Sequence, residues 1–153
     1  MTAKRILCIE DNAMNWRLVQ RLLSQAGYEM HWAEDCLKGY ELALALRPSL
    51  VLLDINLPGL SGFEVATKLR RTPELEGLLI VALTARTMRS DRETALVTGC
   101  DGFISKPIDP FLFVGQVEAY LGGQRDRLEQ GREGVALRQF SQQVVDHLET
   151  QLQ

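Results

Sequence analysis

The stretch Leu50-Val51-Leu52-Leu53-Asp54 decides the fold of this chain. Four apolar residues without polar alternation indicate a strand that is buried on both faces, and such strands belong to parallel sheets covered by helices on each side. The run ends in a carboxylate, and the pair Pro58-Gly59 then marks a turn. We therefore predict a central parallel strand that presents Asp54 at its carboxyl end.

Strand-like and helix-like patterns alternate on both sides of this stretch. Short apolar runs at 5–9, 78–83 and 102–105 and an alternating stretch at 28–33 predict the other strands. Between and after them, apolar residues spaced by three and four predict helices. These expected helices lie at about 16–26, 37–44, 63–71, 88–98 and 113–121. Five strand–helix units predict a flavodoxin-like α/β fold, with a doubly wound five-stranded parallel sheet in the order 2-1-3-4-5.

Length and composition further limit the number of domains, the binding partners and the location that we expect. The chain has 153 residues and a net charge of −3, which suits one domain with a short appendage and disfavours nucleic-acid binding through bulk charge. The longest apolar run, residues 78–83, is too short to span a bilayer, so we expect no membrane contact. Cys8, Cys36 and Cys100 are far apart and odd in number, which predicts reduced, buried thiols and a cytoplasmic location.

Polar side chains end four of the five predicted strands. Because the carboxyl ends of parallel strands meet at one edge of the sheet, we expect these side chains to share a crevice. Three carboxylates and one lysine give this crevice a charge of about −2, and crowded carboxylates raise one another's pKa unless a cation neutralises them. Oxygen ligands with open positions favour Mg²⁺. The residues concerned are Glu10, Asp11, Asp54, Thr84 and Lys106.

Asp54 is the candidate nucleophile of this crevice. A carboxylate can attack phosphorus and form an acyl phosphate. The product carries one more negative charge, which the hydroxyl of Thr84 and the ammonium of Lys106 can stabilise. Each residue alone also has an ordinary interpretation, since Asp11 or Asn12 can cap a helix and Asp54 can belong to a turn. The convergence of four strand ends favours phosphoryl transfer.

As a set, five stretches resemble the receiver domain of bacterial two-component response regulators, over about residues 4–121, and single-domain members of that family most of all. They are Ile6-Leu7-Cys8-Ile9-Glu10-Asp11-Asn12, Val51-Leu52-Leu53-Asp54-Ile55-Asn56-Leu57-Pro58, Gly62, Val81-Ala82-Leu83-Thr84-Ala85 and Phe103-Ile104-Ser105-Lys106-Pro107. The resemblance implies that Asp54 is the phosphoacceptor and that Thr84 and Lys106 bind the phosphoryl group. It implies a Mg²⁺ site made by Glu10, Asp11, Asp54 and the backbone carbonyl of Asn56.

The resemblance also implies a switch. Thr84 moves toward the phosphoryl group and Phe103 turns inward, which changes the surface of the predicted helix at 88–98, strand at 102–105 and helix at 113–121. A cis peptide bond is implied between Lys106 and Pro107. Many relatives have tyrosine at the position of Phe103, and phenylalanine cannot donate a hydrogen bond. An ordinary core aromatic is the alternative for Phe103.

The implied function is that of a phosphoacceptor rather than an enzyme, acting only in its own phosphorylation and dephosphorylation. A sensor histidine kinase or a histidine phosphotransfer protein would be the donor. A downstream protein would bind the switching surface, and two copies could pair through the helix at 113–121 or through a C-terminal helix. Direct nucleic-acid binding is not expected.

The sequence changes character after Leu121. Gly122 and Gly123 open an expected linker at 122–134, and an apolar stripe then predicts one amphipathic helix over 135–153. This helix could pack on its own domain or on a second copy, could lead to an effector domain outside this chain, or could be a partly disordered tail. The stripe comprises Leu137, Phe140, Val144, Leu148 and Leu152.

Two rival functions are weaker. A phosphatase of the haloacid-dehalogenase type also uses an aspartate nucleophile, but it expects Asp-x-Asp on the first strand, where this chain has Glu10-Asp11. A flavodoxin-like nucleotide or flavin module needs a Gly-rich or Ser/Thr-rich phosphate loop after the first strand. The acidic pair at that place would repel phosphate in the absence of a metal.

Overall fold

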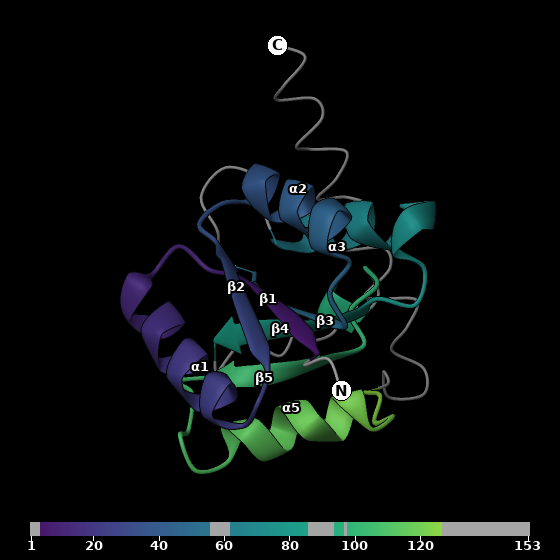
Figure 1. Ribbon diagram of the computed structural model, residues 1–153. Coiled ribbons are helices and arrows are strands. Elements are labelled where there is room, and N and C mark those ends of the chain that lie inside the picture. The colour runs from purple at the N-terminus through teal and green to yellow at the C-terminus, as the bar shows by residue number, and fades with distance from the viewer. Residues whose placement is uncertain (1–3, 56–61, 86–93, 97, 127–153) are drawn as a thin grey trace.

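The computed structural model describes residues 4–55, 62–85, 94–96 and 98–126 (Figure 1). Strands and helices alternate as predicted. The elements are β1 (Arg5–Ile9), α1 (Ala13–Gln25), β2 (Glu29–Ala33), α2 (Cys36–Leu46), β3 (Leu50–Asp54), α3 (Gly62–Arg70), the 3₁₀ turn η1 (Pro73–Leu75), β4 (Leu79–Ala85), β5 (Gly102–Lys106) and α5 (Phe113–Leu121). Residues 94–96, within the helix expected at 88–98, are helical. The Pro58-Gly59 turn and the helix expected at 135–153 lie outside the described residues.

The five strands form one parallel sheet in the order β2-β1-β3-β4-β5, which confirms the predicted topology. Ile9 of β1 pairs with Leu53 of β3, so the residues that follow, Glu10 and Asp54, lie side by side at the ends of the two strands. Asp54 in turn pairs with Leu83 of β4. The register therefore brings the polar strand ends to one edge of the sheet.

Helices cover both faces of the sheet. Figure 1 shows α1 and α5 on one side and α2 and α3 on the other. Val19 of α1 and Val117 of α5 belong to one apolar cluster, while Ala43 of α2 and Leu69 of α3 belong to the second. Residues 50–53 of β3 are fully buried, as expected for a strand covered on both faces.

Local signals fix where the elements begin and end. The side chain of Asn12 accepts hydrogen bonds from the backbone N–H groups of Met14, at 2.9 Å, and Asn15, at 3.0 Å, and so caps α1. Gly27 has a φ of +98°, a left-handed conformation that suits the residue after a helix. The helix thus begins immediately after the acidic pair, which holds that pair at the sheet edge.

Two strands extend further than the apolar runs predicted. β4 continues to Ala85 and β5 to Lys106, because Thr84 pairs with Ser105 and Ala85 with Lys106 in the same ladder. Thr84 and Lys106 therefore belong to the strands themselves. The apolar run marked only the apolar part of each strand, while main-chain pairing continued into the polar residues, of which Thr84 is itself buried.

Cys8, Cys36 and Cys100 are buried thiols, as predicted. Within the part of the chain that the structure describes, no helix combines the length and the apolar character needed to cross a membrane.

Candidate functional site

Three carboxylates converge at the carboxyl edge of the sheet. Glu10, Asp11 and Asp54 each offer an oxygen atom, and these atoms all lie within 4.8 Å of one another. Glu10 and Asp54 are buried, with 1% and 3% of their surface exposed, whereas Asp11 is exposed. The cluster thus has two fixed inner ligands and one outer ligand open to solvent. Such a set can hold a hard cation that keeps some of its water.

Lys106 joins the two buried carboxylates. Its Nζ atom lies 3.0 Å from Oε2 of Glu10 and 3.2 Å from Oδ2 of Asp54. The peptide bond between Lys106 and Pro107 is cis. One ammonium thus contacts two carboxylates, and the three acidic side chains with this lysine carry a formal charge of −2.

The charges of the cluster affect one another. Burial, together with the nearby charge of Asp54, raises the pKa of Glu10 to about 7, although the hydrogen bond from Lys106 opposes this shift. Burial by itself lowers the pKa of Lys106, but the hydrogen bond to Glu10 and the charge of Asp54 outweigh that effect and raise it. The electrostatics therefore favour a bound cation at this edge.

The hydroxyl of Thr84 is the group that most directly suggests binding of a further molecule at this site. It is completely buried, and its Oγ1 atom has no hydrogen-bond partner among the described residues. An unsatisfied buried hydroxyl costs about 1–3 kcal/mol. β4, which carries Thr84, pairs with β3 and with β5, the strands that end in Asp54 and Lys106. A buried hydroxyl of this kind can donate to an acceptor that enters the site.

Sequence reasoning missed a pair of tryptophans beside the acidic cluster. Trp32 of β2 donates from Nε1 to the backbone oxygen of Glu10 at 2.7 Å, and its ring stacks on Trp16 of α1 with 5.5 Å between centroids. The backbone N–H of Asn12 also donates to Oε1 of Glu10, at 3.2 Å. The sequence predicted β1 and β2 as neighbours, and in the structure Cys8 of β1 pairs with Trp32 of β2. That predicted neighbourhood is the signal that could have placed Trp32 near Glu10.

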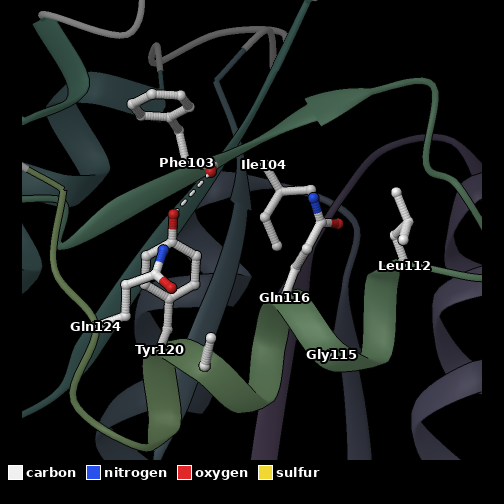
Figure 2. Close-up of a pocket in the computed structure, with 8 residues that line it drawn as sticks. Phe103, Ile104, Leu112, Gly115, Gln116, Tyr120 and Gln124 are labelled. Carbon is white, nitrogen blue, oxygen red and sulfur yellow. Dashed lines mark hydrogen bonds between the residues drawn. The ribbon is translucent and has the colours of Figure 1, made fainter.

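Phe103 lies on β5, and β4 separates β5 from β3, the strand that carries Asp54. Its half-buried ring packs with the α2–α3 cluster, and Figure 2 shows it on the opposite side of β5 from Tyr120. Its backbone faces α5, because its carbonyl oxygen accepts from the Tyr120 hydroxyl at 3.0 Å. Asn56, the expected backbone ligand, lies outside the described residues.

The sequence matches a known family over most of its length. The family model for the response regulator receiver domain matches residues 6–118. Among curated relatives, the polar-differentiation response regulator DivK of Brucella anthropi is 38% identical over 119 residues, which are 78% of this chain and 97% of that relative. DivK of Brucella ovis is 37% identical over the same share of each chain.

Solved structures agree on the fold. The chemotaxis response regulator CheY4 of Vibrio cholerae superposes with a TM-score of 0.73 at 24% identity, covering 77% of this chain and 98% of that one. The receiver domain of a sensor histidine kinase from Pseudomonas aeruginosa has a TM-score of 0.72 at 26% identity, covering 80% of this chain and all of that one. That domain was solved with a magnesium ion coordinated in its active-site cleft.

Proposed function

The chain belongs to the response regulator receiver domain family, and on that premise we propose that Asp54 accepts a phosphoryl group from a histidine kinase or a histidine phosphotransfer protein. A member of this family is a signalling phosphoacceptor module rather than a conventional enzyme. The observation that carries the proposal is the buried Asp54 carboxylate, which contacts Lys106 and shares one small space with Glu10 and Asp11.

Asp54 supplies the nucleophile. One of its carboxylate oxygens forms the new bond to phosphorus, while the bond from phosphorus to the donor's imidazole nitrogen breaks and the imidazole leaves with its electron pair. The step needs no general base, because a carboxylate nucleophile has no proton to give up.

Lys106 and Thr84 can stabilise the phosphorylated product. The transferred group adds one negative charge beside two existing carboxylates, and Lys106 is the cation near enough to offset it. The Thr84 hydroxyl, which has no partner among the described residues, gains a phosphoryl oxygen as acceptor. Both side chains thus stabilise the phosphorylated form more than the unphosphorylated one.

Glu10, Asp11 and Asp54, with the backbone carbonyl of Asn56, are the groups proposed to hold Mg²⁺. When bound, the ion neutralises the charge of the carboxylates and of the phosphoryl oxygens. The closely spaced oxygen atoms, two of them from buried carboxylates, and the resemblance to a magnesium-bound receiver domain support this assignment.

The output belongs to the same proposal. We expect Thr84 and Phe103 to change packing together and so to alter the surface around β5 and α5, which a downstream protein would bind. The buried cysteine thiols fit a cytoplasmic location. Residues 4–121 would form the receiver domain, 122–134 the linker and 135–153 a helix, and an effector domain outside this chain is compatible with all of this.

Intact-mass measurement with acetyl phosphate and Mg²⁺ tests the proposal. The wild-type chain should gain one phosphoryl group, and Asp54→Asn should gain none because an amide is not a nucleophile of this kind. A Glu29→Gln variant is the matched control, since Glu29 begins β2 opposite Arg5, at the other edge of the sheet from the cluster, and it should be phosphorylated normally. Equal phosphorylation of Asp54→Asn and wild type would contradict the proposal.

A further inference from the structure

A groove runs between β5 and α5. It has a volume of about 370 Å³ and is lined by side chains of both elements, among them Ile104, Leu112, Gln116, Ala119 and Tyr120 (Figure 2). The apolar surface continues at its end, where Leu112 is 58% exposed and the neighbouring Phe111 is 95% exposed. An open apolar surface of this kind marks a contact site for another segment or molecule.

The chain itself returns to this groove after α5. Gln124 lines it, and the backbone N–H of Asp126 donates to the carbonyl of Asp101 at 2.9 Å. The side chain of Asp126 accepts from the backbone N–H of Phe103 at 3.1 Å and from the hydroxyl of Tyr120. These bonds fix the chain beside the groove at the point where the next 27 residues, 127–153, begin.

Those following residues carry an apolar stripe that needs cover. Leu137, Phe140 and Val144 share one face of the helix that the sequence predicts, and as a helix they span about 10 Å. The groove side of α5 from Leu112 to Tyr120 spans about 12 Å. The stretch between, residues 127–134, can reach about 28 Å when extended and contains Gly131 and Gly134, so it is long enough to turn back.

We propose that the apolar stripe of residues 135–153 binds in the β5–α5 groove of its own chain. A tethered segment meets its site at a local concentration in the millimolar range, which favours it over a second copy at ordinary protein concentrations. The amides of Gln116 and Gln124 in the groove wall can pair with the glutamine-rich segment. The bound segment would cover the surface that a downstream partner needs. This inference stands whether or not Asp54 accepts phosphate.

Paramagnetic relaxation enhancement in the full chain tests the proposal. A spin label on Gln139→Cys lies opposite the stripe, so it leaves the contact intact, and the three native cysteines are buried. We expect the amide signals of Leu112, Gln116 and Ala119 to lose more than half their intensity relative to the reduced label. The amides of α2, on the other face of the sheet, should be unaffected.

Two further variants identify the contact. At Gly115 an added Cβ meets no atom within 4 Å, so Gly115→Arg should fold normally while its side chain fills the groove and restores the signals. Phe140→Asp should restore them as well, and Gln142→Asp, off the stripe, should not. Unchanged signals in the labelled wild-type background, or loss confined to α2, would overturn the proposal.

A mixed sample separates the own-chain contact from a dimer. Isotope-labelled chain without the spin label is combined with spin-labelled chain of natural isotope content. Full intensity at α5 in this mixture supports binding within one chain. Signal loss at α5 in the mixture assigns the groove to a second copy and overturns the proposal.

Discussion

Lys106 contacts two buried carboxylates at once, and this double contact determines how the residues of the site depend on one another. Removing the ammonium leaves Glu10 and Asp54 buried without their cation, while the three acidic ligands proposed for Mg²⁺ stay in place. Metal binding and phosphate acceptance should therefore respond differently to changes at this residue.

Lys106→Met should keep Mg²⁺ binding but accept phosphate from acetyl phosphate at least about tenfold more slowly, which corresponds to about 1.4 kcal/mol in the barrier. The reason is the loss of the charge that offsets the incoming phosphoryl group. Rates from intact-mass time courses check this, with Lys38→Met, an exposed lysine on α2, as the control. Wild-type rates in Lys106→Met would remove Lys106 from the proposed chemistry.

Thr84→Val should stabilise the unphosphorylated protein by about 1 kcal/mol, because it removes a buried hydroxyl that has no partner in the described residues. Urea unfolding in EDTA measures the change in free energy of unfolding. Thr67→Val is the matched comparison: its hydroxyl donates to the carbonyl of Phe63 at 3.0 Å, so its loss should destabilise. A clear loss of stability in Thr84→Val would show that the hydroxyl already has a partner.

At the scale of single elements, the strand ends carry the site, and the sequence predicted them unevenly. The runs at 5–9 and 50–53 were long and apolar enough to place Glu10 and Asp54 at strand ends. The sequence also placed Thr84 at a strand end, but the extension of β4 to Ala85 depends on pairing with β5, which a single-sequence pattern does not encode. The stacking of Trp16 on Trp32 was likewise missed, because it joins α1 to β2 across the fold.

The N-terminus of α3 approaches the end of β3 closely at Gly62. A Cβ atom at this residue would lie 2.4 Å from Cα of Ile55 and 2.8 Å from the carbonyl oxygen of Asp54, and both atoms belong to the backbone. Gly62→Ala should therefore displace the end of β3, destabilise the protein by about 1–3 kcal/mol and slow phosphorylation.

Gly115→Ala on α5 is the matched control for that substitution. Its Cβ meets open space, so alanine should stabilise the helix by up to about 1 kcal/mol. Thermal unfolding and acetyl phosphate kinetics on the two variants check the pair. Equal behaviour of Gly62→Ala and Gly115→Ala would mean that the close approach at Gly62 has no consequence for the site.

At the scale of the whole molecule, stability and metal binding are linked through the acidic edge of the sheet. Since the folded chain assembles the carboxylates and the unfolded chain separates them, Mg²⁺ should bind the folded state preferentially. At a concentration 100 times its dissociation constant, such a ligand adds about 2.7 kcal/mol to the free energy of unfolding.

Urea unfolding with saturating Mg²⁺ should thus show a higher midpoint than unfolding in EDTA, and Asp11→Asn should reduce the difference. Asn12→Asp keeps the cap of α1 and adds an acid beside the cluster. It tests whether that acid increases the difference between the midpoints in Mg²⁺ and in EDTA. No shift with Mg²⁺ in the wild-type chain would contradict the metal assignment.

The central claim is that Asp54 carries the phosphoryl group, and borohydride trapping tests it most directly. Borohydride reduces an aspartyl phosphate to homoserine, so peptide mass spectrometry after treatment with acetyl phosphate and Mg²⁺ identifies the residue that was phosphorylated. Homoserine at position 54, absent when EDTA replaces Mg²⁺, is the result expected here. Homoserine at another aspartate, or at none, would contradict the account.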